Sequence, residues 1–187
     1  DRVQVKDPKG RFHQIILVHG GKFQSNRGGF LHDEVIGRPD GQVIITEEGR
    51  EFQIMRPLMV DYVMSMPRGA AVVYPKDAGV ITHMGDIFPG ATVVEAGAGS
   101  GALSMALLNA VGPKGHLISV ERRQEFADIA RANVDLWFGA AHPAWDLRVG
   151  DLAAELAPME EGSVDRVVLD MLAPWENVAE GARVLVP

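Results

Sequence analysis

The chain has 187 residues, of which 47% are hydrophobic and 23% are charged, and its formal net charge is −7. This composition is typical of a globular protein with a sizeable core, and the acidic balance argues mildly against a protein that coats nucleic acid. The absence of cysteine excludes disulfides and thiolate metal sites and favours a reducing compartment. The sequence shows no signal peptide and no long apolar span, so we expect a cytoplasmic protein that does not contact membranes.

The charge is distributed unevenly along the chain. Residues 1–66 contain nine basic and nine acidic side chains, whereas residues 67–187 contain nine basic and sixteen acidic ones. Within residues 1–29, six Lys or Arg side chains outnumber two Asp side chains. This local excess predicts either a solvated surface or a patch that binds phosphate, for which Lys22 and Arg27 are the candidates.

Short β-like runs alternate with turn residues in the first 56 positions. The runs cover residues 3–5, 12–18, 43–45 and 52–55, and they predict a small barrel or meander. Residues 57–66 carry apolar side chains at helical spacing and predict a linking helix. We therefore expect a small N-terminal β domain over residues 1–66, with a boundary at Pro67–Gly69.

The pattern changes to alternating strands and helices after residue 66. Strands are predicted near 71–74 and at 91–95, 116–120, 146–149 and 164–169, and helices at 76–84, 101–111, 123–137 and 174–184. Such alternation indicates an α/β domain with a parallel sheet and ligands at the carboxyl ends of its strands. The first residue is not Met, and the series stops where a further strand is expected. We therefore expect a fragment whose domain at 67–187 is incomplete at its C-terminus.

A glycine-rich turn follows the strand at 91–95 and opens an apolar helix. Gly97, Gly99 and Gly101 leave room for a ligand to approach the backbone, although dinucleotide-binding folds use similar turns. Glu121 ends the next strand, twenty residues after Gly101, where a carboxylate can accept hydrogen bonds from both ribose hydroxyls. Glu95 precedes the glycines and is a candidate to face a cationic amino acid group. S-adenosylmethionine fits these features better than a pyrophosphate dinucleotide.

Two further carboxylates follow predicted strands. Asp151 is a candidate acceptor for the exocyclic amine of a bound adenine, with Leu152 packing nearby, or else it is the N-cap of a short helix. Asp170 precedes a turn that contains Pro174 and Trp175, which suggests a site for methylating a nucleobase amine. The alternative for that segment is a turn Asp followed by a core Trp, and the alternative for Glu121 is a first-turn acid favoured by the helix dipole.

Residues 74–83 contain a second group of candidates for substrate binding. Tyr74 could stack on a base, and Lys76, followed by Asp77, could meet a phosphate. In the alternative interpretation, Pro75 is the first residue of a helix and Asp77 is a first-turn acid. His83 either contacts the substrate or has a structural role. The histidines lack the spacing of metal ligands, so no metal site is expected.

Together these residues resemble the tRNA (adenine-58-N1)-methyltransferase family of bacteria and archaea, and the composition is closest to actinobacterial members. The resemblance covers essentially the whole chain. It rests on short motifs at Gly28–Gly29, His32–Asp33, Arg56–Pro57, Asp61–Val63, Tyr74–Asp77 and Gly85–Asp86, on the glycine turn, on Glu121 and Asp151, and on Asp170–Trp175. It implies a small N-terminal β domain, a Rossmann-like class I methyltransferase domain, S-adenosylmethionine as cofactor and a homotetramer that binds tRNA.

The resemblance also implies a role for each site residue. The cofactor's methionine part should lie along Gly97, Ala98, Gly99, Ser100, Gly101, Ala102 and Leu103. Glu121 should hold the ribose, with Arg122 beside it, and Asp151 the cofactor adenine, whereas Phe126 should pack beside the cofactor. Asp170 should contact both the cofactor's methyl donor region and the amino group of the target adenine.

The reaction implied is direct methyl transfer to N1 of adenine 58 in the T-loop of tRNA. The protein would mainly align the reacting atoms, and the base must leave its loop to reach the pocket. Two alternatives remain open at this point. One is a methyltransferase of the same fold that acts on another substrate, and the other is a non-catalytic tRNA-binding subunit, as occurs among eukaryotic relatives.

Overall fold

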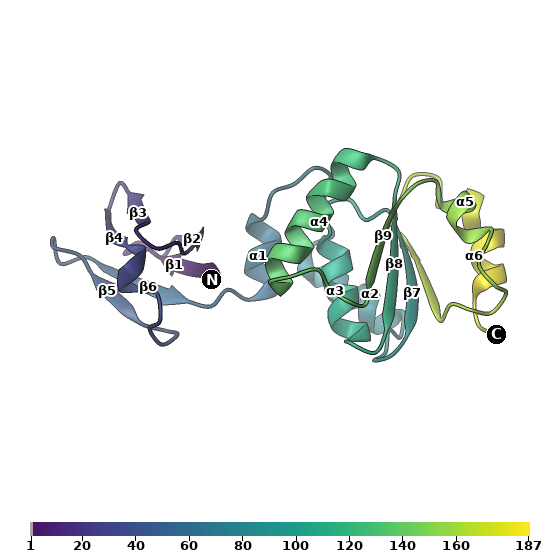
Figure 1. Cartoon of the computed structure of the whole chain (residues 1–187), viewed down its shortest axis with the longest axis horizontal. Coiled ribbons are helices and arrows are strands. Elements are labelled where there is room, and N and C mark those ends of the chain that lie inside the picture. Colours follow the sequence, from purple (N-terminus) through teal and green to yellow (C-terminus); the bar gives the residue numbers. More distant parts are fainter. Residues whose placement is uncertain (1) are drawn as a thin grey trace. The chain divides into compact units, whose positions relative to one another are not determined.

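The computed structural model describes residues 2–187 and divides the chain into two compact units, the first ending at Ser65 and the second beginning at Met66 (Figure 1). Each unit is described by itself. Among the described residues, no helix is both long and apolar enough to cross a membrane.

The N-terminal unit is built from short antiparallel strands. Its main sheet has the order β2-β1-β6-β5, and β3 and β4 form a separate hairpin. A short 3-10 helix follows β4, and α1 closes the unit. The bounds are β1 Arg2–Lys6, β2 Phe12–Ile16, β3 Lys22–Ser25, β4 Gly28–Leu31, η1 His32–Glu34, β5 Val43–Ile45, β6 Glu51–Met55 and α1 Met59–Ser65.

Phenylalanine side chains form the centre of this small unit. Phe23 from the hairpin and Phe52 from the main sheet have ring centroids 6.0 Å apart, and Phe30 lies within 5.9 Å of Phe52. The expected β-rich domain is thus confirmed, but the β3–β4 hairpin was not predicted from the sequence. Its strands are mostly glycine and exposed polar residues, and only one inward Phe on each strand ties them to the core.

The second unit is a parallel sheet covered by helices on both faces, so the predicted α/β class is confirmed. The sheet order is β10-β7-β8-β9, with α2, α3 and α4 on one face and α5 and α6 on the other (Figure 1). The bounds are α2 Pro75–Met84, β7 Thr92–Ala96, α3 Ala102–Val111, β8 His116–Glu121, α4 Gln124–Phe138, β9 Trp145–Val149, α5 Leu152–Leu156, β10 Arg166–Leu169, η2 Pro174–Asn177 and α6 Val178–Val184.

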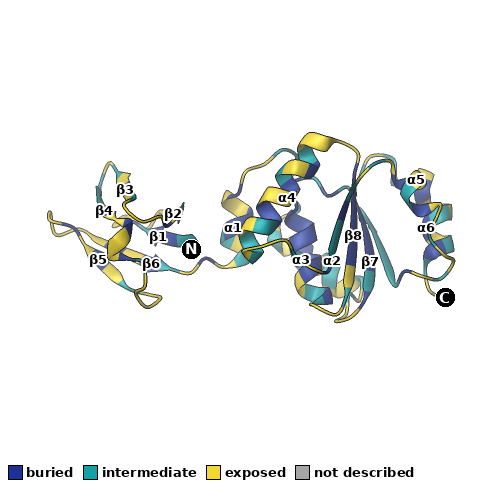
Figure 2. Cartoon of the chain, viewed as in Figure 1, coloured by how far each residue is buried: buried dark blue, intermediate teal, exposed yellow. Residues whose placement is uncertain are grey.

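Burial explains why the strands are so apolar. Figure 2 shows that β7 and β8, in the middle of the sheet, are buried, whereas exposed residues lie on the outer faces of the helices. Val94 and Val120 pack with Leu156 on the α5–α6 side, and Ala130 of α4 packs with Leu147 on the other side. Strands covered on both faces carry continuous Val, Ile and Leu runs, which is the pattern that predicted them.

Two predicted elements are wrong in detail. Residues 71–74 form no strand, because the segment before them runs beside the glycine turn instead of joining the sheet. The helix predicted at 174–184 is divided into η2 and α6. Ala173 adopts a left-handed conformation with φ of +52° immediately before Pro174, and the first turn is then 3-10.

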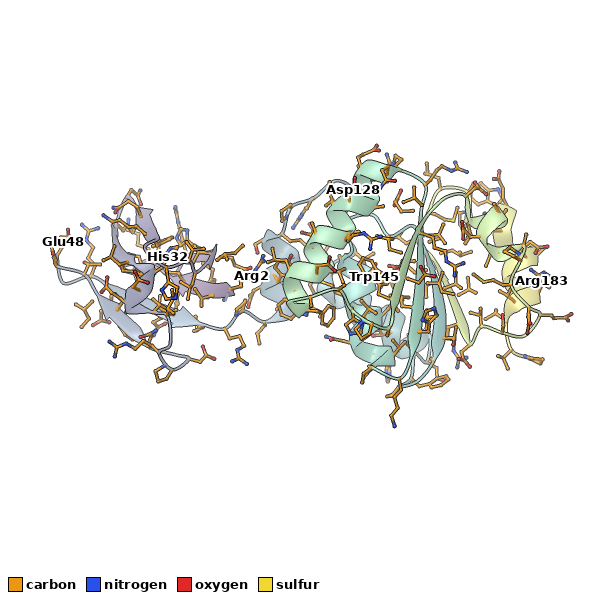
Figure 3. All side chains as sticks on the ribbon, in the orientation of Figure 1. Arg2, His32, Glu48, Asp128, Trp145 and Arg183 are labelled. Atoms are coloured by element: carbon orange, nitrogen blue, oxygen red, sulfur yellow. The ribbon has the colours of Figure 1, made fainter. Side chains whose placement is uncertain are left out.

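A buried polar network lies beneath the glycine turn. Glu95 of β7 is completely buried, and its Oε2 accepts hydrogen bonds from Ser104 Oγ at 2.6 Å and from Ser119 Oγ at 2.5 Å. Trp145 Nε1 donates to Ser119 Oγ at 2.8 Å (Figure 3). Among the described residues, Glu95 Oε1 has no hydrogen-bond partner. Burial raises the pKa of Glu95 to about 7, although both serines lower it, and the charges of Asp170 and Glu121 raise it further.

This network generates a prediction for Glu95→Gln. The folded protein binds the Glu95 proton more tightly than the unfolded chain does, so the wild type loses stability as the pH rises from about 4.5 to about 7. The variant has no such loss. The difference in free energy of unfolding between the variant and the wild type should therefore change by up to about 3 kcal/mol in favour of the variant when the pH is raised from acidic to mildly alkaline values. Urea unfolding at both pH values measures this difference. Glu125→Gln, at an exposed position of α4, is the control, and a pH-independent difference for Glu95→Gln would contradict the assignment.

Candidate functional site

The carboxyl ends of four parallel strands meet at one edge of the sheet. Ala96 is paired with both Val120 and Leu169, and Glu121 is paired with Val149. The pairing continues past the strands, because Gly97 N–H donates to Asp170 O at 3.1 Å. The glycine turn, Glu121, Asp151 and Asp170 therefore gather at this edge, as the sequence predicted.

Two of the glycines are required by contacts that the structure shows. Gly101 has φ of +80°, and a Cβ there would lie 3.1 Å from both Ala130 O and Val134 Cγ2. A side chain at this position would therefore push α3 away from α4. A Cβ at Gly97 would lie 3.2 Å from Glu121 Oε2. Glycine at position 97 therefore keeps the space beside that carboxylate open.

Glu121 is held in place by backbone groups on both sides. Its side chain is buried, Oε2 accepts from Gly99 N–H at 2.9 Å, and Oε1 accepts from Arg123 N–H at 3.0 Å. A carboxylate oxygen has capacity for a second hydrogen bond, so both oxygens can still accept from hydroxyls of a ribose. A buried acceptor beside a Cβ-free backbone fits the ribose and amino acid parts of S-adenosylmethionine.

The segment before α2 is fastened to the glycine turn. Ser100 Oγ accepts from the N–H groups of Gly69 and Ala70 at 3.2 and 3.3 Å. Asn133 of α4 donates from Nδ2 to both Pro67 O and Ser100 O at 2.9 Å. The Ser100 hydroxyl thus connects the glycine turn to the segment before α2. Sequence reasoning missed Asn133, whose only signal is an amide on the otherwise apolar buried face of α4.

Two of the cofactor candidates, Phe126 and Glu95, lie next to the glycine turn and are packed against other groups of the protein. Phe126 packs beside the same segment, because a Cβ at Gly69 would lie 2.8 Å from its ring, and the Arg123 guanidinium lies 3.6 Å above the ring centroid. Glu95 lies under the turn without exposed surface. Direct contact between Glu95 and a ligand's amino group would need an exposed carboxylate, and that contact stays a prediction.

Asp151 lies at the same edge of the sheet, and both of its carboxylate oxygens already have partners within the protein. It is the N-cap of α5, where its Oδ1 accepts from Ala153 N–H at 3.1 Å, and its Oδ2 pairs with the Arg122 guanidinium. Arg122 and this N-terminal hydrogen bond hold the pKa of Asp151 below its usual value. The N-cap alternative is confirmed, and Leu152 is a buried core residue. Contact between Asp151 and an adenine stays a prediction.

Asp170 and the turn after it are open to solvent. Asp170 is exposed, and its carboxylate has no hydrogen-bond partner among the residues that the structure describes. Trp175 is 72% exposed and Leu172 is 93% exposed, so the alternative of a core Trp is wrong. An unpaired carboxylate with an exposed indole five residues away can recognise a flat ligand that carries an amino group.

The residues at 74–83 do not all come to this edge. Tyr74 is half exposed and is the N-cap residue of α2, with Pro75 as the first helical residue, as the alternative interpretation proposed. Lys76 Nζ pairs with Asp77 at 2.7 Å. His83 lies near Gly85, whose carbonyl accepts from Arg166 at the amino end of β10. His83 is therefore near the opposite edge of the sheet from Asp170.

The two basic candidates of the N-terminal unit have different surroundings. Lys22 is exposed on β3, and the side chain of Arg27 is 12% exposed and pairs with Asp7. Arg27 thus has a structural contact within its own unit, and its contact with RNA stays a prediction.

Comparisons with known proteins agree on one family. Residues 1–44 match the TrmI-like N-terminal family, and residues 54–186 match the family of the tRNA methyltransferase complex GCD14 subunit. The chain is 36% identical to a Thermus thermophilus protein named tRNA (adenine(58)-N(1))-methyltransferase TrmI, over 98% of this chain and 70% of that protein. A Methanocaldococcus jannaschii enzyme named for adenines 57 and 58 is 34% identical, over 77% of this chain and 58% of its own.

Solved structures show the same fold. A SAM-dependent O-methyltransferase from Thermotoga maritima superposes with a TM-score of 0.89 at 30% identity, over 99% of this chain and 68% of its own. The tRNA (m1A58) methyltransferase TrmI from Aquifex aeolicus, at 24% identity, gives a TM-score of 0.84 over 100% and 70%. With the family match over residues 54–186 and the 36% identity to a curated relative, the chain belongs to the GCD14/TrmI family of tRNA methyltransferases.

Proposed function

We propose that this protein transfers a methyl group from S-adenosylmethionine to N1 of adenine 58 in the T-loop of tRNA. The observation that carries the proposal is the gathering of Glu121, Asp151 and Asp170 around the glycine turn at one sheet edge. The family membership supports the tRNA substrate, and the Thermus thermophilus relative at 36% identity carries that activity in its name. Radiolabelled methyl transfer to an unmodified tRNA, followed by identification of the product nucleoside, tests the proposal. A tRNA with another base at position 58 should accept no methyl group.

The residues of this chain provide orientation and charge. S-adenosylmethionine, when bound, supplies a methyl group on a sulfonium that needs no further activation. Glu121 would accept hydrogen bonds from the ribose, and the glycine turn would leave the backbone accessible beside it. Asp170 would accept a hydrogen bond from the N6 amino group of the target adenine. Its negative charge would also stabilise the positive charge that methylation places on the ring.

The turn after β10 is suited to hold a base outside its loop. The exposed Trp175 offers a ring face for stacking, and Pro174 stiffens the turn that presents it. A base-modifying enzyme must take its target out of the surrounding stack, and an aromatic platform compensates for part of the lost stacking energy. Asp170 would thus bind the edge of the adenine, and Trp175 would stack on its face.

The resemblance also leads us to propose that four copies of the chain assemble and act in the cytoplasm. Assembly would bring several copies of the basic segment at 1–29 together, which supports binding of tRNA by a chain with an acidic total charge. Sedimentation equilibrium gives the mass in solution, and a monomer at all concentrations would contradict the assembly.

The first prediction for this site concerns cofactor affinity. Glu121→Ala removes a buried acceptor that can serve both ribose hydroxyls, so binding of S-adenosylmethionine should weaken by about 2–3 kcal/mol, or roughly 30- to 160-fold. Calorimetric titration of the variant measures this loss. Glu125→Ala removes the same charge from an exposed position of α4 and should bind normally. Unchanged affinity of Glu121→Ala would show that the ribose lies elsewhere.

The second prediction concerns the chemical step. Asp170→Ala should lower the single-turnover methylation rate about a hundredfold or more, because it removes both the acceptor for the amino group and the stabilising charge. Asp170→Asn keeps an acceptor oxygen but loses the charge, so its methylation rate should lie between those of the wild type and Asp170→Ala. The affinity for tRNA should change little, since phosphate contacts provide most of it. Asp128→Ala on the exposed face of α4 is the matched control (Figure 3). A wild-type rate in Asp170→Ala would remove Asp170 from the reaction.

A further inference from the structure

The N-terminal unit has an open cavity on its surface, at the point where three hairpin turns come together. Its volume is about 590 Å³, and it is lined by Pro8, Lys9, Asn26, Arg27 and Arg50. These residues come from the β1–β2 turn, the β3–β4 turn and the turn that joins β5 to β6. Three of the five lining side chains are cations, and none is an acid. The basic segment at 1–29, in which the sequence predicted a possible phosphate patch, includes Lys9 and Arg27. The sequence did not indicate Arg50, which is flanked by Glu47, Glu48 and Glu51 and lies far from that segment.

Asp7 does not line the cavity but pairs with Arg27, which does. Its side chain is 2% exposed, accepts from Lys9 N–H at 2.8 Å and from Arg11 N–H at 3.0 Å, and pairs with Arg27. Burial alone would raise the pKa of Asp7, but these backbone groups together with His13 and Arg27 hold it well below its usual value. Asp7 therefore stays ionised and holds the guanidinium of Arg27 in one orientation.

Arg27 keeps donors for a ligand. Its Nη1 pairs with Asp7, while its Nε and Nη2 have no hydrogen-bond partner among residues 2–187. A guanidinium has five N–H donors in a rigid fork, so one carboxylate contact leaves a face that can donate to two oxygens of an anion. The side chain is thus oriented before the ligand arrives.

The other cations of the cavity are exposed and are not held in ion pairs. Lys9 and Arg50 have no salt bridge to any described residue. Glu48 is the acid near Arg50 and Lys22, whose positive charges help to lower its pKa after its hydrogen bonds to Thr46 and to its own backbone (Figure 3). Of the five lining side chains, three are cations and none is an acid, and Asp7, the acid paired with Arg27, is buried. The lining itself is therefore positive.

We infer that this cavity binds a backbone phosphate of the tRNA substrate. The inference rests on the proposed function, and it adds a contact site in the N-terminal unit. A phosphodiester has two unesterified oxygens that match the fork of Arg27, while Lys9 and Arg50 add charge and Asn26 a neutral amide. The lining is too polar for an apolar ligand, and the Asp7 pair makes the site rigid.

The test is the charge-removing double variant Lys9→Ala/Arg50→Ala in the full chain. Arg27 is left in place, because its removal would leave Asp7 buried without its cation. The matched control is Arg38→Ala/Arg56→Ala, which removes the same charge from exposed positions of the same unit that do not line the cavity. The probe is an unmodified tRNA transcript, whose dissociation constant is measured at about 50 and about 200 mM salt.

The cavity variant should bind tRNA about tenfold or more weakly at the lower salt concentration, and the slope of log affinity against log salt should fall by about one, as expected for the loss of one phosphate contact. The control variant should lose much less in both quantities. Affinity for S-adenosylmethionine and the single-turnover rate at saturating tRNA should stay at the wild-type values, and an unchanged melting temperature shows that the unit is folded.

Two outcomes would overturn the inference. Equal losses in both variants would mean that only the overall charge matters, and no loss in the cavity variant would mean that the cavity does not touch RNA. Failure of the proposed function is a separate result, because it appears as an absence of N1-methyladenosine at position 58 with the wild-type protein.

Discussion

The pairing of β7 with a parallel neighbour on each side is the constraint on which the candidate active site depends. Ala96, the last residue of β7, is in register with Val120 of β8 and Leu169 of β10. That register places the residues after all three strands at one edge, although they are separated by up to about seventy positions in the chain. Without it, the glycine turn, Glu121 and Asp170 would not lie together.

The same strand carries the least expected group of the core. Glu95 is one residue from the end of β7, and its neighbours Ser104, Ser119 and Trp145 tie α3, β8 and β9 to it. A buried carboxylate with one oxygen lacking a partner is costly, and proteins retain such groups where they fix a particular arrangement. Here the arrangement is the end of β7 that leads into the glycine turn, which these hydrogen bonds connect to α3, β8 and β9.

Much of this architecture could be predicted, because strands covered on both faces must be apolar and glycine turns have a strong local signal. The failures also have physical causes. The apolar run at 71–74 has the residues of a strand, but Ser100 and Asn133 fasten the segment before it to the turn, and no pattern in the sequence announces those contacts. The positions of Arg50 and His83 could not be predicted for the same reason. Each depends on contacts with segments that are distant in the sequence. The left-handed conformation of Ala173, which divides the predicted helix at 174–184, is likewise not signalled by the sequence.

The hydrogen bond from Gly99 N–H to Glu121 has a consequence for the energetics of recognition. It closes the turn against the strand end before a ligand is present. The conformational entropy of ordering those glycines is therefore lost when the chain folds and does not have to be lost again when a ligand binds. A turn with three glycines would otherwise be among the most expensive segments to immobilise. The folded protein thus presents a rigid receptor at the position where its sequence is most flexible.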